Sequence, residues 1–242
     1  MSFTSLLKGL DLLIERLKIS KCHMLGEGFG GYIAQCYAQY RPAKVASLVL
    51  CNSYCDLSHF VDSSPWTGML SWMPDMLMKR FLVSDLRYIG PEEDFIKAYK
   101  FVSLHSKKFD TDDLCSRLTL QYTHGPLKPK EFPITDEAIT IVDTADPIAF
   151  PDRVRLEVHK YYPGAKEVTL QSGGTFPFLS RPDAFNKALE DHLEANTLRI
   201  ASVSQSQATP SSSNAESASS TASTTALEPH PTSPSIAPED FS

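Results

Sequence analysis

The sequence lacks any apolar run of about 18 residues, which is the length that a membrane-spanning helix needs. Its first residues also lack the basic, apolar and small-residue zones of a secretory signal peptide. Lysine and arginine number 23 against 29 acidic residues and are scattered, so no basic stripe for nucleic acid is present. These absences predict a cytoplasmic protein that binds no nucleic acid and associates with membranes at most peripherally.

Cysteine is also scarce, with five residues in a chain of 242. An odd number of cysteines, mostly in apolar segments, is typical of reduced, packed thiols and not of a disulfide scaffold. Cys51 and Cys55 lie close together, but no second Cys or His pair with ligand spacing accompanies them, so we expect no metal site. The five residues are Cys22, Cys36, Cys51, Cys55 and Cys115.

An amphipathic helix is predicted over roughly the first eighteen residues, because Leu6, Leu10, Leu13 and Leu17 recur at helical spacing. The alternative is a helix that lies on a membrane surface. Its polar face carries charges of both signs and its length is ordinary, so we expect it to face a protein core through these leucines.

Helical and strand patterns then alternate along the chain, which implies an α/β protein with a parallel sheet of about four strands. A stretch of aromatic, Met and Leu residues at helical spacing indicates a helical cap insertion at about 56–121. The Ser/Thr/Pro-rich residues 199–242 predict a disordered tail after a single domain at 1–198. Strands are predicted at 21–25, 45–51, 138–142 and 167–170, and further helices at 32–40, 153–161 and 182–196.

The first strand ends in a glycine-rich turn that leads directly into a helix, Gly26-Glu27-Gly28-Phe29-Gly30. A nucleophile elbow has the pattern G-x-S-x-G at such a turn, where the central serine projects its hydroxyl above the sheet. Gly28 occupies the position of that serine and has no group that could attack an acyl carbon. The turn is therefore predicted to be an elbow without its nucleophile.

The other two positions of a catalytic triad follow the later strands. Asp146, which follows the strand at 138–142, stands where the acid usually lies. Gly174, in Ser172-Gly173-Gly174-Thr175-Phe176-Pro177 after the last strand, stands where the histidine usually lies. Two of the three roles are thus unfilled, and we predict that the chain is not an enzyme and has no catalytic residue.

Substitutes for the missing groups are few. A residual hydrolase could use Glu27, Ser172 or Thr175 in a rearranged site, but nothing in their spacing favours one. None of the seven histidines stands where a triad base would, and each is expected to be structural or solvated. They are His23, His59, His105, His124, His159, His192 and His230.

Gly26 to Gly31 also satisfies G-x-G-x-x-G between a strand and a helix, with Asp56 downstream. This pattern is typical of dinucleotide binding, in which a pyrophosphate lies at the helix N-terminus. A dinucleotide fold does not explain Asp146 and Gly173-Gly174 in hydrolase order. We therefore keep dinucleotide binding as the alternative and expect no cofactor.

With its elbow turn, Asp146 and the Gly173-Gly174 loop in this order, the sequence resembles the maspardin family of α/β-hydrolase-fold proteins over about Leu6 to His192. This family also has Gly-Gly where the hydrolase histidine belongs, but it keeps serine in its elbow, where this chain has Gly28. The resembling stretches are Leu25-Gly26, 32–35, 47–53, Trp72-Met73-Pro74, 116–120, 162–165 and 173–178.

The resemblance implies a partial α/β-hydrolase fold that lacks the N-terminal strands preceding the elbow strand. The elbow strand would then form an open sheet edge that is available for pairing with a partner. It also implies an adaptor that binds cytosolic proteins, including enzymes, or the cytoplasmic tails of membrane receptors. Such an adaptor would act in endosomal or trans-Golgi sorting and signalling.

Overall fold

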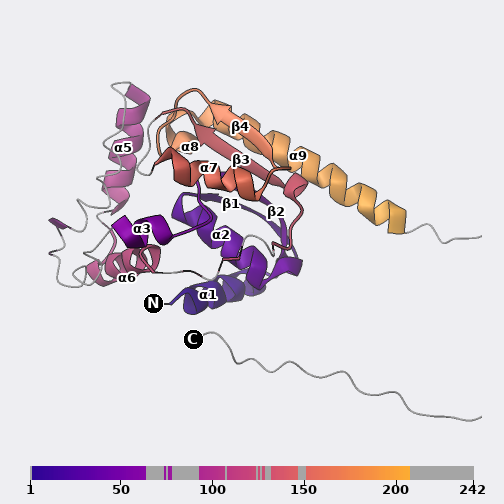
Figure 1. Cartoon of the computed structure of the whole chain (residues 1–242), viewed down its shortest axis with the longest axis horizontal. Coiled ribbons are helices and arrows are strands. Elements are labelled where there is room, and N and C mark those ends of the chain that lie inside the picture. The colour runs from indigo at the N-terminus through magenta and orange to yellow at the C-terminus, as the bar shows by residue number, and fades with distance from the viewer. Residues whose placement is uncertain are drawn as a thin grey trace, which may run out of the picture.

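The structure, a computed structural model, describes residues 2–63, 74, 76–77, 93–106, 108–123, 125, 127–128, 132–146 and 151–207 (Figure 1). Trp72-Met73 and the predicted tail beyond Gln207 lie outside these residues.

A parallel sheet of four strands forms the centre of the described fold, in the order β1-β2-β3-β4. The strands are β1 (Cys22–Glu27), β2 (Val45–Cys51), β3 (Ile139–Thr144) and β4 (Lys166–Leu170). All residues of β2 and β3 are buried, as their continuous apolar sequences predict for strands covered on both faces. The predicted sheet of about four parallel strands is confirmed.

Helices cover both faces of this sheet (Figure 1). On one face, α1 (Phe3–Arg16) packs against α2 (Phe29–Tyr40), and both form the larger apolar core together with α7 (Asp152–Tyr161) and inward residues of β2 and β3. On the other face, α9 (Pro182–Gln207) packs through Phe185 and Ala188 on Val49, Val142 and Leu170. The short helix α8 (Pro177–Ser180) precedes α9, and 3-10 turns at Pro42–Lys44 and Asp136–Ala138 lead into β2 and β3.

The insertion between β2 and β3 is helical wherever the structure describes a regular element, as predicted. It contributes α3 (Ser58–Ser63), α5 (Glu93–Ser106) and α6 (Thr111–Gln121), which gather beside one end of the sheet in Figure 1. Helix α5 contacts α8, so the insertion reaches the loop that follows the last strand.

The first helix forms as predicted, but the face that it buries differs from the prediction. Leu13 and Leu17 are 54% and 60% exposed, whereas Asp11 is buried. The Asp11 carboxylate accepts hydrogen bonds from the Tyr37 hydroxyl at 2.9 Å and from Arg41 Nε at 2.8 Å. Because these partners on α2 and just after it hold Asp11, the helix is rotated away from its predicted leucine stripe.

Several element boundaries also differ from the sequence prediction. Strand β1 ends at Glu27, two residues past its predicted end. Helix α2 begins at Phe29 because the elbow glycines already form its first turn. Strand β3 continues through Asp143 and Thr144, which pair with Thr169 and Leu170 of β4. Helix α9 continues to Gln207, past the predicted domain end at 198, because residues such as Leu198 and Arg199 favour helix.

Candidate functional site at the elbow

The candidate site lies at the carboxyl ends of the four strands. Because the sheet is parallel, all four of these ends lie on the same side of the sheet. Gly28 follows β1, Asn52 follows β2, Asp146 follows β3, and Gly173-Gly174 follow β4. The fold thus brings all three predicted triad positions to one edge of the sheet. In parallel α/β sheets this edge is where ligands usually bind.

The elbow turn is held in a conformation that suits glycine. Gly28 has φ 50° and ψ −118°, a left-handed backbone that side chains rarely adopt. Its N–H donates to the Cys51 carbonyl at 2.9 Å. A Cβ on Gly26 would overlap the backbone of Gly30 and Gly31, so the strand can pass this close to the helix only with glycine there.

Gly28 itself has room for a side chain. A Cβ built at this position meets nothing closer than the Asn52 carbonyl, at 4.0 Å. Serine at position 28 would therefore cost backbone strain without a steric clash. The absence of a nucleophile at Gly28 is a matter of sequence and not of space.

Asn52 connects the strand ends across the candidate site. Its Oδ1 accepts a hydrogen bond from the Thr144 N–H at 3.0 Å, and its Nδ2 donates to the Gly174 carbonyl at 3.1 Å. Asn52 is buried and has φ 41°, a region that asparagine tolerates better than most residues. The next residue, Ser53, donates from its hydroxyl to the Gly28 carbonyl at 3.1 Å.

Asp146 binds the loop at the predicted histidine position. Its Oδ2 accepts hydrogen bonds from the backbone N–H groups of Gly173 at 2.5 Å and Gly174 at 2.8 Å. In a hydrolase triad the corresponding carboxylate would hold the imidazole in place. Here two peptide N–H groups donate to the carboxylate oxygen, and Gly174 has no imidazole that could do so.

The Gly173-Gly174 loop is fixed on its other side as well. The Ser180 hydroxyl donates to the Gly173 carbonyl at 2.6 Å, and the Thr144 hydroxyl donates to the Gly174 carbonyl at 3.0 Å. Gly174 has φ 60°, and a Cβ there would lie 3.4 Å from the Phe95 ring of α5. A side chain at position 174 would thus be strained by the backbone, and its Cβ would contact the insertion.

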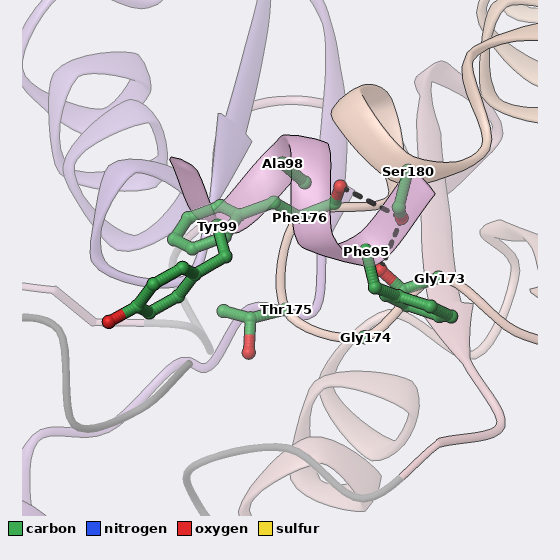
Figure 2. Close-up of a pocket in the computed structure, with 8 residues that line it drawn as sticks. All are labelled: Phe95, Ala98, Tyr99, Gly173, Gly174, Thr175, Phe176 and Ser180. Atoms are coloured by element: carbon green, nitrogen blue, oxygen red, sulfur yellow. Dashed lines mark hydrogen bonds between the residues drawn. The ribbon is translucent and has the colours of Figure 1, made fainter. Parts of the chain in front are cut away.

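A small apolar pocket lies between α5 and this loop (Figure 2). Its empty volume is about 230 Å³, which includes open solvent at its mouth. In Figure 2 the Thr175 hydroxyl points away from Ser180. The pocket is lined by Phe95, Ala98, Tyr99, Gly173, Gly174, Thr175, Phe176 and Ser180.

The residues considered as substitutes for the missing catalytic or binding groups take part in contacts that hold the fold together. Ser172 accepts a hydrogen bond from Arg181 Nε at 2.8 Å, and the Arg181 guanidinium lies 4.8 Å from the centre of the Phe95 ring. Glu27 is the half-buried last residue of β1. Asp56, the acid of the dinucleotide alternative, accepts hydrogen bonds from the N–H and hydroxyl of Ser58 and so caps the start of α3.

The described histidines lie away from Asp146. His159 bonds Asp143 and Glu167, and His192 bonds Ser47 and Thr140. The remaining three bond elsewhere: His23 to Ser47, His59 to Arg153, and His105 to the Phe101 carbonyl. His124 and His230 lie outside the described residues.

Within the described part of the chain, no cluster of His, Cys, Asp and Glu has an arrangement that could hold a metal ion. The same residues contain no helix with the length and apolar character that crossing a membrane requires. All five cysteines are free thiols, as expected from their number and positions.

Sequence reasoning missed the part that Asn52 and Thr144 play in joining the strand ends. Asn52 directly follows the buried strand β2, and a polar residue at that point was the available signal. Its partners are more than ninety positions away in the sequence, so the pairing itself leaves no local pattern.

Comparison with known proteins agrees with this geometry. A family model of the alpha/beta hydrolase fold matches residues 1–182. Maspardin of Danio rerio is 32% identical over 188 residues, which are 76% of this chain and 59% of that protein. Maspardin of Homo sapiens is 32% identical over 189 residues, 76% of this chain and 60% of that protein. The chain thus spans about 60% of the length of these relatives.

Solved structures show the same fold at low sequence identity. One, from a study of carboxylesterases of the thaumarchaeon Nitrososphaera gargenis, matches with a TM-score of 0.65 and 17% identity, over 82% of this chain and 74% of that one. The enol-lactonase of Burkholderia xenovorans matches with a TM-score of 0.62 and 17% identity, over 80% and 74%. The chain therefore belongs to the α/β-hydrolase fold family and resembles the maspardins over three quarters of its length.

Proposed function

We propose that the protein is a non-catalytic, maspardin-like interaction protein. The observation that carries the proposal is the Asp146 carboxylate, which binds the peptide N–H groups of Gly173 and Gly174 at the position expected for the catalytic histidine. The nucleophile is the second group that the predicted triad lacks, because Gly28 occupies its position at the elbow. An acyl transfer enzyme of this fold needs both a nucleophile and a base to activate it.

The resemblance to maspardins supports a role in binding other proteins. On this proposal the chain is an adaptor that binds cytosolic proteins or the cytoplasmic tails of membrane receptors. It would act in the cytosol or at the surface of endosomal and trans-Golgi membranes. The exposed edge strand β1, in which Leu25 is 42% exposed, is a candidate for pairing with an extended segment of such a partner.

Ester hydrolysis tests the non-catalytic half of the proposal. The full chain is assayed with p-nitrophenyl acetate and butyrate beside an Asp146→Asn variant. We expect both proteins to give the same rate, close to that of buffer. A faster rate that falls in the variant would show that the site is a working hydrolase and would overturn the proposal.

Calorimetric titration with receptor cytoplasmic-tail peptides tests the binding half. We expect saturable binding that is weakened by Leu25→Asp on β1 and unchanged by Leu156→Asp, a matched control on α7 where the leucine is 55% exposed. Equal weakening by both variants would argue against the β1 edge. Absence of saturable binding across a panel of tails would contradict the adaptor role.

The dinucleotide alternative has less support in the structure. Pyrophosphate sites of that kind lie at a switch point where the strand order reverses, with strands on both sides of the first one. In the described sheet the order β1-β2-β3-β4 has no reversal. Asp56 is also engaged with Ser58.

A further inference from the structure

His159 on α7 lies between two carboxylates that belong to different strands. Its Nε2 is 2.7 Å from Asp143 Oδ2 on β3, and its Nδ1 is 2.7 Å from Glu167 Oε1 on β4. One imidazole ring thus joins a helix to two neighbouring strands. These distances are typical of charge-assisted hydrogen bonds.

The protonation state of the ring decides whether both contacts can form. A neutral imidazole has one N–H and one lone pair, so it can donate to only one of the two carboxylates. The imidazolium ion has two N–H groups and can donate to both. The geometry at His159 therefore fits the charged ring.

Asp143 depends on His159 more than Glu167 does. Its side chain is 9% exposed, whereas that of Glu167 is 56% exposed. The nearby Arg155 donates to the Thr144 carbonyl and to Asp152, and in the described part of the chain Asp143 Oδ1 has no hydrogen-bond partner. His159 is accordingly the group that directly neutralises Asp143 there.

We propose that His159 is a proton-dependent clamp that fixes α7 to β3 and β4 and loosens it when the imidazolium loses its proton. The clamp holds the two strands that lead into the candidate site. Strand β3 leads into Asp146, and β4 leads into the Gly173-Gly174 loop that Asp146 binds.

The pKa of His159 is shifted in the direction that the clamp requires. Burial lowers the pKa of the His159 ring, but its hydrogen bonds to Glu167 and Asp143 outweigh this and leave that pKa raised. Burial raises the pKa of Asp143 against the opposing effect of His159. Because the folded pKa of His159 exceeds the unfolded one, its stabilisation is complete below about pH 6.5 and is lost as pH rises through the folded value.

Chemical unfolding of the full chain between pH 5.5 and 9 tests the clamp. The urea midpoint of the wild type should exceed that of His159→Gln at the acid end, and the difference should shrink as pH rises. His105→Gln is the matched control, since His105 is a half-buried helical histidine whose hydrogen bond, within the described part of the chain, goes to the Phe101 carbonyl of its own helix. Parallel pH profiles of the wild type and His159→Gln would overturn the proposal.

NMR titration of the histidine rings provides a test that does not depend on a folded His159 variant. The His159 pKa of the wild type should lie above 6.5, and Glu167→Gln should lower it because one carboxylate is removed. Amide exchange in α7, corrected for intrinsic rates, should become faster above that pKa. A His159 pKa of 6.5 or less, or equal α7 protection on both sides of the transition, would overturn the clamp.

Discussion

The Asn52 side chain accepts a hydrogen bond from the Thr144 N–H across the ends of β2 and β3. The same amide donates to the carbonyl of Gly174, so one side chain joins the ends of two strands to the loop after a third. The Asn52 backbone is left-handed, with φ 41°. The position of the Asp146 and Gly174 segments therefore depends on a residue that belongs to no predicted triad position.

Asn52→Ala should lower the free energy of unfolding by about 2–4 kcal/mol. Two buried backbone groups each lose a partner, and alanine is strained at positive φ. Urea unfolding measures the loss. Asn52→Gly separates the two causes, because it relieves the strain and still removes both hydrogen bonds. If the alanine and glycine variants were as stable as the wild type, Asn52 would not connect the strand ends in the way described.

Gly26→Ala should destabilise the protein by about 2–4 kcal/mol, because its Cβ would overlap the backbone at Gly30 and Gly31. Gly30→Ala is the matched control on the same turn. A Cβ on Gly30 meets nothing within 4 Å, and alanine favours helix, so this variant should be stabilised by about 0.5–1 kcal/mol. Thermal unfolding measures the two effects. Equal shifts of the unfolding midpoint in the same direction for both variants would contradict the close approach of Gly26 to the helix.

On the proposed function, Gly28→Ser should fold and show no esterase activity. The Cβ fits, with strain of about 1–2 kcal/mol from the left-handed backbone, but no imidazole among the described residues bonds Asp146 to activate the hydroxyl. Stopped-flow assay with p-nitrophenyl acetate should show no burst of p-nitrophenol. A burst equal to the protein concentration would mean that a base outside the predicted triad serves the elbow.

His192 should make the protein sensitive to acid. Burial, with the neighbouring charge of His23, lowers the pKa of His192 to about 4, and the ring bonds Ser47 and Thr140. In the unfolded chain the His192 ring binds a proton near pH 6.5, whereas in the folded protein it stays neutral down to about pH 4. The free energy of unfolding therefore falls between about pH 6.5 and 4, by at most about 3 kcal/mol.

His192→Gln removes this titrating group and should flatten the fall in stability. The comparison is the urea midpoint of the wild type and the variant at pH 7 and pH 4.5. If both midpoints dropped equally between the two pH values, another group would be responsible.

Local patterns predicted most of the fold, because β2 and β3 are buried along their whole length and appear in the sequence as unbroken apolar runs. They failed on α1, where Asp11 is buried and Leu13 is exposed. That outcome depends on Tyr37 and Arg41, which no periodicity in the first eighteen residues can reveal.

For the candidate site, motif order predicted Gly28, Asp146 and Gly174 as triad positions, and the parallel sheet brings these three residues to the same end of the strands. It could not reveal the bond from Asp146 to the backbone of Gly173, since peptide groups are the same in every sequence. The His159 clamp was missed for a related reason. Asp143, His159 and Glu167 lie on three different elements, and each is ordinary in its own segment.

The hydrogen bonds of Asp146 to two peptide groups also oppose the placement of a histidine at position 174. Gly174 has φ 60° and Gly173 has φ 153°, and glycine adopts both values more readily than other residues do. Histidine at position 174 would either strain this backbone or leave it and give up the hydrogen bond to Asp146, and its Cβ would lie 3.4 Å from the Phe95 ring. A working triad at these positions would thus require coordinated changes in the elbow and in the loop after β4, which no single substitution supplies.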